Sequence, residues 1–178
     1  HTRRLSLQGL LCGLWVPAMA LEAPKQKVVL SLTGKVTQHN AGGQVDFDMG
    51  QLAALPQHSF TTRTPWDKDA RKFSGPLLRD VLAAAGAHGE TLQAIALNDY
   101  KVSIPVADAR QYDVIIASAV DGQAMRVRDR GPLFIVYPYD TEPDLKSQTF
   151  NSRSLCQDAR LAPKYLRHSP PGQPVHPR

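Results

Sequence analysis

Residues 73–82 read FSGPLLRDVL, and this segment carries the strongest helical pattern in the chain. From Leu77 to Ala85 apolar residues recur at intervals of three and four, which places them on one face of a helix. Pro76 suits the first turn, where its missing N–H costs nothing, and Gly86 suits the position just after the last turn. The pattern predicts an amphipathic helix over residues 76–85.

Short strand-like segments lie on both sides of this helix. They are rich in β-branched and aromatic residues and are bounded by turn residues. Asp48 can cap a short helix that Pro56 stops, and Asp121-Gly122 is a strong signal for a hairpin turn. Many short strands with few helices predict a mixed α+β domain. The main predicted strands are residues 28–36, 45–47, 58–64, 92–97, 101–104 and 133–137.

Three further segments complete a recognisable pattern. They are NDYKVSIP at 98–105, DVIIA at 113–117 followed by Asp121-Gly122, and GPLFIVYP at 131–138. Together with residues 73–82, and in this order, they resemble the oxidoreductase molybdopterin-binding domain, over about residues 28 to 157. The resemblance implies the sulfite-oxidase fold, an α+β fold with a mixed β-sheet and a few short helices. It is nearest to small stand-alone exported members, some of which resemble pterin-binding sensory proteins and others molybdopterin-dependent oxidoreductases.

The resemblance also locates a missing metal ligand. Molybdenum enzymes of this family carry a thiolate ligand just before the helix, but here residues 60–66 read FTTRTPW, without a cysteine. A threonine hydroxyl stays protonated, and soft metals prefer thiolate. Of the two cysteines, Cys12 lies in a predicted signal peptide, and Cys156 stands where relatives carry an aromatic residue. We therefore expect a pterin or molybdopterin ligand rather than a molybdenum centre.

Seven residues are candidates for binding such a ligand. A pterin ring is flat, its edge carries donors and acceptors, and a phosphate tail needs cations. Aromatic faces, an amide, a carboxylate and guanidinium groups match these needs. The candidates are Trp66, Tyr100, Asn98, Asp99, Arg63, Arg130 and Arg153. The alternatives are that Asn98-Asp99 is only a turn between strands, and that residues 128–130 form only a solvated charged turn.

Other function classes find no support in the sequence. The formal net charge of +5 is scattered, without the basic and aromatic patterning of nucleic-acid binding. None of the six histidines lies at a metal-ligand spacing from another. The nucleophile elbow, the phosphate loop and the dinucleotide fingerprint are all absent from the sequence.

The two ends of the chain differ from the middle. Residues 1–20 predict a secretory signal peptide, with Arg3 and Arg4 before an apolar stretch and Ala18-Met19-Ala20 as a cleavage site. The alternative is an apolar N-terminal helix in the core. Cleavage would leave a pterin-binding domain over residues 21–157 and predicts a periplasmic location.

Residues 158–178 predict an irregular polar tail, where the family continues into a final apolar strand. A shifted reading frame is one explanation for this departure. Without that strand, a sheet edge would be exposed.

We therefore expect a periplasmic, non-catalytic sensory module that binds a pterin or molybdopterin-like ligand and serves the periplasmic domain of a membrane signalling protein. The first alternative is a molybdopterin-dependent oxidoreductase that holds molybdenum without a cysteine, or with a partner subunit. The second is a structural or interaction domain with an empty pocket.

Overall fold

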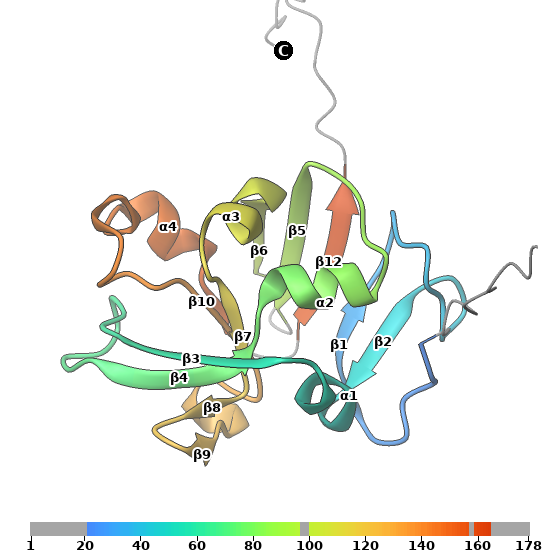
Figure 1. The fold of residues 1–178 in the computed structure, drawn as a ribbon, viewed down its shortest axis with the longest axis horizontal. Coiled ribbons are helices and arrows are strands. Elements are labelled where there is room, and N and C mark those ends of the chain that lie inside the picture. The colour runs from blue at the N-terminus through green and yellow to red at the C-terminus, as the bar shows by residue number, and fades with distance from the viewer. Residues whose placement is uncertain (1–20, 97–99, 157–158, 165–178) are drawn as a thin grey trace, which may run out of the picture.

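A computed structural model describes residues 21–96, 100–156 and 159–164, which fold into three small sheets and a few short helices (Figure 1). The prediction of an α+β fold with few helices is confirmed. The helices are α1 Met49–Ala54, α2 Leu78–Ala84, α3 Val106–Gln111 and α4 Gln148–Arg153, with two 3₁₀ turns, η1 Val127–Asp129 and η2 Pro143–Leu145. Among the described residues, no helix has the length and apolar character needed to cross a membrane.

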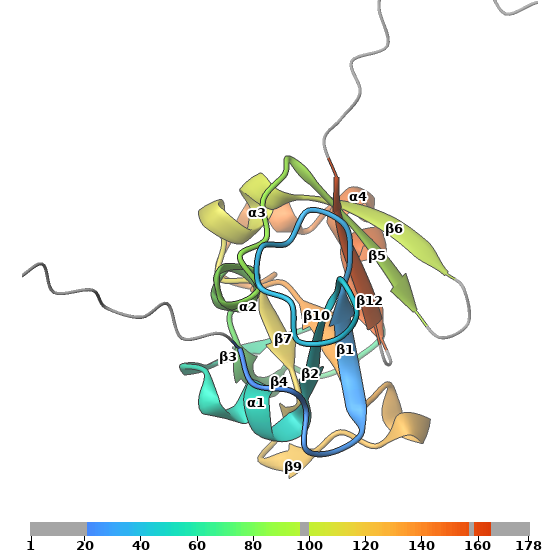
Figure 2. The ribbon, with the colours of Figure 1, turned by 90° about the vertical axis from the view of Figure 1, so that its right-hand side faces the viewer.

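The largest sheet has five strands in the order β2-β1-β12-β5-β6 (Figure 2). Strands β1 and β12 run parallel, and the other neighbours are antiparallel. The residues of β5 alternate between a buried and a more exposed position, as expected for a strand with one face on a core, whereas β1 buries the consecutive residues Val29 and Leu30. The strands are β1 Val28–Leu32, β2 Val45–Asp48, β5 Thr91–Ala96, β6 Lys101–Pro105 and β12 Ala159–Lys164.

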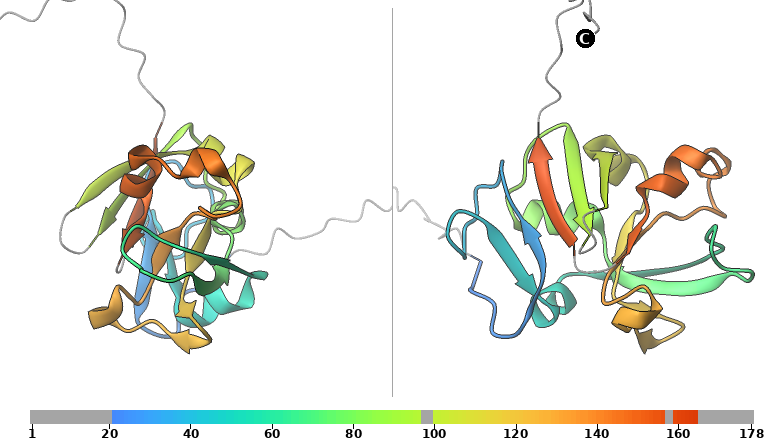
Figure 3. Two further views of the ribbon diagram at one scale, coloured as in Figure 1. Left: turned by 90° about the vertical axis from the view of Figure 1, so that its left-hand side faces the viewer. Right: turned by 180° about the vertical axis from the view of Figure 1, so that it is seen from behind.

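The central strand of this sheet corrects a prediction. Residues 158–178 were expected to be irregular, but Ala159–Lys164 forms β12, which pairs with β1 on one side and β5 on the other (Figure 3). The sheet edge that was expected to be exposed is therefore paired with β12. The physical reason is that both neighbours offer unpaired backbone groups, and ladder hydrogen bonds are worth more than local polarity. Pro163 is tolerated because the pairing with β1 ends at Leu161.

The two smaller sheets carry the candidate site. One has the order β3-β4-β8-β9 and the other the order β11-β10-β7. At Asp121-Gly122 the backbone adopts positive φ angles of 50° and 78°, which confirms the predicted hairpin turn between β8 and β9. The strands are β3 Gln57–Thr62, β4 Arg71–Pro76, β7 Ile115–Ala117, β8 Ala119–Val120, β9 Gln123–Ala124, β10 Phe134–Val136 and β11 Leu155–Cys156.

Helix α2 supplies much of the core, as its pattern predicts. Leu78, Val81 and Leu82 are buried. The predicted start was wrong, however, because Pro76 ends strand β4 and the helix begins at Leu78. Gly75, the residue before Pro76, allows strand β4 to lie very close to strand β7. A β-carbon there would lie 2.1 Å from the Ile116 carbonyl oxygen, so only glycine lets β4 approach β7 this closely.

Asp48 caps α1 as predicted. Its carboxylate accepts the backbone N–H of Gln51 at 2.8 Å, and the Gln51 side chain accepts the N–H of Asp48 in return. The backbone N–H groups of Lys25 and Gln26 also donate to this carboxylate. Although desolvation opposes it, this set of donors lowers the pKa of Asp48, with the Gln51 bond as the largest cause.

Candidate functional site

The segment that follows β3 is fixed by Asp140, which lies far along the chain. The backbone N–H of Arg63 donates to the Asp140 carboxylate at 2.7 Å, and the backbone N–H of Asp140 donates to the Thr62 hydroxyl at 3.1 Å. Thr62 is fully buried. These two bonds hold residues 62–63 against the chain that leaves β10, within the segment where the sequence resemblance implies a thiolate in the enzymes.

This junction borders a cavity of about 250 Å³, which we call the loop cavity. The volume is close to the lower end of the range for small-molecule sites, about 300–1,000 Å³. Its lining combines two cations, a carboxylate, an amide, a phenol and the loop backbone. The lining residues are Arg63, Thr64, Pro65, Tyr139, Asp140, Lys146 and Asn151.

Charge in the loop cavity is balanced by Asp140. Lys146 Nζ lies 3.3 Å from the Asp140 carboxylate. The backbone hydrogen bond from Arg63 is the largest cause of a lowered pKa for Asp140; desolvation opposes it, and the hydrogen bond and charge of the Lys146 ammonium lower the pKa further. Asp140 is therefore ionised near neutral pH. Arg63 and Lys146 leave the cavity with a net positive charge, which favours a ligand that carries an anionic group.

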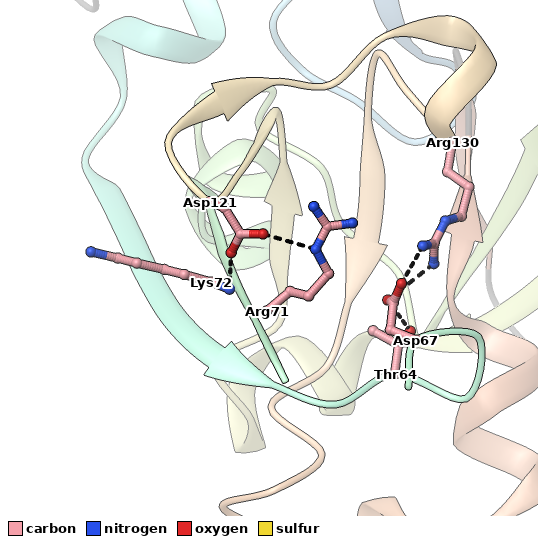
Figure 4. A network of polar contacts seen from close by, with 6 residues as sticks. All are labelled: Thr64, Asp67, Arg71, Lys72, Asp121 and Arg130. Carbon is pink, nitrogen blue, oxygen red and sulfur yellow. Dashed lines mark hydrogen bonds and ion pairs between the residues drawn. The ribbon is translucent and has the colours of Figure 1, made fainter. Parts of the chain in front are cut away.

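A second polar contact ties the same loop to η1. The Thr64 hydroxyl donates to Asp67 at 2.6 Å and accepts the Trp66 backbone N–H at 3.4 Å. Arg130 then donates to both oxygens of Asp67, at 3.2 and 2.5 Å (Figure 4). Desolvation alone would raise the pKa of Asp67, but the hydrogen bonds from Arg130 and Thr64, with the charge of Arg130, lower it.

Beyond Arg130 lies a second and larger cavity of about 730 Å³, which we call the arginine cavity. Asp121 lies in its wall and accepts hydrogen bonds from the Lys72 backbone N–H at 2.9 Å and from Arg71 Nε at 2.8 Å (Figure 4). The Lys72 bond is the largest cause of the lowered pKa of Asp121. The lining residues are Arg71, Val120, Asp121, Gln123, Ala124, Met125, Arg126, Arg128 and Arg130.

The structure divides the predicted site residues among several places. Arg63 lines the loop cavity, and Arg130 lines the arginine cavity. Trp66 is 52% exposed, and its ring meets Phe134 edge-on at 6.0 Å between centroids. The Arg130 guanidinium lies 5.8 Å from the centre of the same Phe134 ring. Trp66 and Arg130 thus share Phe134 as a support.

The other predicted residues lie near α4 or outside the described residues. Tyr100 is 48% exposed, and its hydroxyl lies 3.5 Å from the Ser152 carbonyl oxygen. Arg153 donates to Asp108 at 2.7 Å and stacks on Phe150, so it has a structural role. The predicted edge-reading residues, Asn98 and Asp99, lie outside the described part of the chain.

The ion pair of Arg153 sits in a small buried network. Asp108 also accepts the Tyr137 hydroxyl at 2.9 Å. Burial, with the negative charge of Asp108, raises the pKa of Tyr137, which therefore stays neutral. This network anchors α4 to α3 and β10, and so it positions Asn151 on the wall of the loop cavity.

Sequence analysis missed the residues that organise both cavities. Asp67 and Asp140 look like ordinary loop carboxylates in the sequence, and Lys146 and Asn151 belong to a polar segment without a pattern. Asp67 pairs with Arg130, 63 residues away, and Asp140 pairs with the backbone of Arg63, 77 residues away. A single sequence carries no signal for such distant pairs.

Comparison with known proteins now adds to this geometry. Residues 19–140 match the model of the oxidoreductase molybdopterin binding domain. The fold is similar to that of the sulfane dehydrogenase SoxCD from Paracoccus pantotrophus, with a TM-score of 0.57 and 20% sequence identity. The alignment covers 80% of this chain but 39% of that protein, so this chain spans about two fifths of its length. No curated protein sequence matches the chain. The chain has the sulfite-oxidase-type fold and belongs to the oxidoreductase molybdopterin-binding domain family.

Proposed function

We propose that this protein binds a pterin or molybdopterin-type ligand in the loop cavity, and that it acts as a non-catalytic sensory module for a periplasmic domain of a membrane signalling protein. Family membership supports the ligand class. The loop cavity is the place for the ligand because residues 63–65, from the segment that holds the thiolate in the enzymes, form part of its wall.

The observation that carries the non-catalytic part is the state of the two threonines in that segment. The Thr62 hydroxyl accepts the Asp140 backbone N–H, and the Thr64 hydroxyl is bonded to Asp67 and Trp66. Both threonines are buried. Their hydroxyls therefore stabilise the loop, and a metal ligand at either position would have to break those bonds.

The residues of the loop cavity fit the organic ligand better. Arg63 and Lys146 are placed to bind a phosphate or another anionic tail, and the Asn151 amide can read the edge of a ring. The exposed Trp66 follows Pro65 in sequence and lies outside the cavity lining, so its ring offers an aromatic face only to a ligand that extends beyond the cavity. When bound, a molybdopterin can supply redox chemistry through its ring and any metal it carries.

A binding module without turnover acts through a partner that responds to the bound state. The predicted signal peptide, residues 1–20, supports export, and it lies outside the described residues. A change in the Lys146–Asp140 ion pair when an anionic ligand binds would be the signal that such a partner reads.

One observation favours the alternative of a molybdenum enzyme. Strand β11 pairs with β10 so that the backbone of Cys156 lies opposite Phe134, and the Phe134 ring packs against Trp66. A cysteine that is remote in sequence is thus near the candidate loop in the fold. Replacing it with serine, Cys156→Ser, separates the two functions, because only the enzyme would lose bound molybdenum.

A fluorescence titration tests the proposal. The chain is titrated with the oxidised and tetrahydro forms of a 6-substituted pterin phosphate, and its tryptophan emission is followed, with Trp66→Phe as the reference because Trp15 also emits. We expect quenching, and we expect Arg63→Gln and Lys146→Gln each to weaken binding by about ten- to a hundredfold, which corresponds to a lost charged hydrogen bond of about 1.5–3 kcal/mol. Lys101→Gln, at an exposed position on β6, is the matched control.

Unchanged emission with every pterin would contradict the proposal and favour a domain with an empty pocket. Equal weakening by Lys101→Gln would show that only general charge attracts the pterin.

A further inference from the structure

The arginine cavity is separate from the loop cavity, since the two share no lining residue. Asp67 lies between them: it binds Thr64 of the loop cavity and Arg130 of the arginine cavity (Figure 4). At about 730 Å³, the arginine cavity is the larger of the two and well within the usual range for small-molecule sites. The proposed pterin ligand occupies the loop cavity, so the proposed function assigns no ligand to the arginine cavity.

Charge is the distinguishing feature of the arginine cavity. Four arginines line it against one lining carboxylate, Asp121. Asp67, which does not line the cavity, neutralises the charge of Arg130 through an ion pair. Asp129 lies between Arg128 and Arg130 in sequence. Three of the four arginines lie within five residues of one another, at 126, 128 and 130, and come from one turn. This density of guanidinium groups creates a positive potential inside a concave surface, where it is strongest.

The arginines are held in place by ordered backbone. Arg71 is on strand β4, and its Nε donates to Asp121 at 2.8 Å, which fixes the plane of the guanidinium. Within the described part of the chain, the two terminal nitrogens of Arg71 have no hydrogen-bond acceptor. Figure 4 shows these nitrogens directed away from Asp121, toward the space between β4 and η1.

The arginines of the η1 turn, which also line the arginine cavity, stand on a tightly packed backbone. Arg126 and Arg128 flank Val127 on η1 and are exposed. The turn is tight, because a β-carbon at Gly131 would lie 2.5 Å from the Met125 carbonyl oxygen. Arg130 adopts a left-handed conformation with φ of 70°. The backbone that carries these arginines is therefore constrained by packing and by its turn conformation.

We propose that the arginine cavity is a binding site for a small polyphosphate anion, such as a diphosphate group. Guanidinium groups bind phosphate oxygens through paired hydrogen bonds, and two or more phosphates are needed to engage both walls. A cavity of this volume admits the diphosphate together with a group that carries it, whereas an acidic protein surface would contact mainly the rim. The proposal is independent of the function assigned to the loop cavity.

Calorimetric titration of the full chain with inorganic pyrophosphate tests it. We expect saturable binding with one site, at least tenfold tighter than for orthophosphate or sulfate. The double variant R126Q/R128Q should weaken pyrophosphate binding at least tenfold. Both positions are exposed, and circular dichroism of the double variant checks that the fold is retained. The control K101Q/R110Q removes the same charge from exposed positions on β6 and α3 and should change the affinity less than twofold.

Three outcomes would overturn the proposal. The first is equal weakening in both double variants, which would mean a general charge effect. The second is preference for a hexaglutamate peptide over pyrophosphate, which would point to a protein partner. The third is full competition between pyrophosphate and a pterin lacking phosphate, which would mean that the two cavities form one site.

Discussion

Arg130 donates to both carboxylate oxygens of Asp67, across 63 residues of sequence, and so joins the loop after β3 to the 3₁₀ turn before β10. The Asp67 side chain is only 9% exposed and that of Arg130 33%. A paired, largely shielded contact of this kind is stronger than a surface ion pair. It fixes the wall between the two cavities.

Asp67→Asn should therefore destabilise the protein. The amide keeps the shape of the carboxylate but loses the charge and one acceptor oxygen, while Arg130 stays in place. We expect the free energy of unfolding, measured by urea denaturation, to fall by about 1–3 kcal/mol. Asp69→Asn, at an exposed position in the same loop, should change it by less than about 0.5 kcal/mol. Equal effects of both variants would contradict this role of Asp67.

The same contact predicts a pH dependence. The pKa of Asp67 is lowered in the folded protein below its ordinary value of about 3.9, so its contribution to stability is complete above about pH 5 and is lost as the pH falls through the folded pKa. The difference in the free energy of unfolding between wild type and Asp67→Asn should therefore shrink on acidification from pH 6 to pH 3. A difference that stays constant with pH would mean that the charge of Asp67 does not matter.

Gly75→Ala should be strongly destabilising. The added methyl group would lie 2.1 Å from the carbonyl oxygen of Ile116, so β4 and β7 would have to move apart. We expect the free energy of unfolding to fall by about 1–3 kcal/mol, with a lower Tm in calorimetry. Gly50→Ala on α1 is the control, because its nearest neighbour is a side-chain oxygen of Asp48 at 3.3 Å. Similar Tm values for both variants would argue against the close approach.

The backbone pairing of β12 can be tested at Leu161. This residue pairs with Leu32 of β1 and Ala94 of β5, so Leu161→Pro would remove an N–H from the centre of the sheet. We expect partial unfolding or aggregation, seen as lost β signal in circular dichroism and as higher-order species in size-exclusion chromatography. Leu161→Val keeps the N–H and should stay folded. A soluble, fully folded Leu161→Pro variant would mean that β12 is dispensable.

Sequence patterns predicted those elements whose causes are local. The capping box at Asp48 and Gln51 and the apolar face of α2 depend on residues within a few positions of one another, and both are confirmed. Strand β4 was missed because Arg71, Lys72 and Gly75 have low strand propensity, and its partners β3 and β8 decide its conformation. Strand β12 was missed for the same reason, since its pairing with β1 and β5 overrides a polar sequence.

The candidate site was predictable only in part. Arg63 was chosen as a source of positive charge for a ligand, and the structure places it in the lining of the loop cavity, while its role as a ligand residue stays a prediction. Arg130 and Arg153 were grouped with it by charge alone, yet Arg130 faces a different cavity and Arg153 pairs with Asp108. Residue type gives the chemistry of a side chain, but the distant partners Asp67 and Asp108 decide where that chemistry is available.

We propose that this family member holds an organic pterin without a catalytic metal. The most direct measurement is made on the protein purified from its native cells, with molybdenum determined by elemental analysis and the co-purifying small molecule identified by mass spectrometry. We predict a pterin or molybdopterin near one per chain and molybdenum far below that ratio. Molybdenum at one per chain in the wild type, lost in Cys156→Ser, would contradict the account.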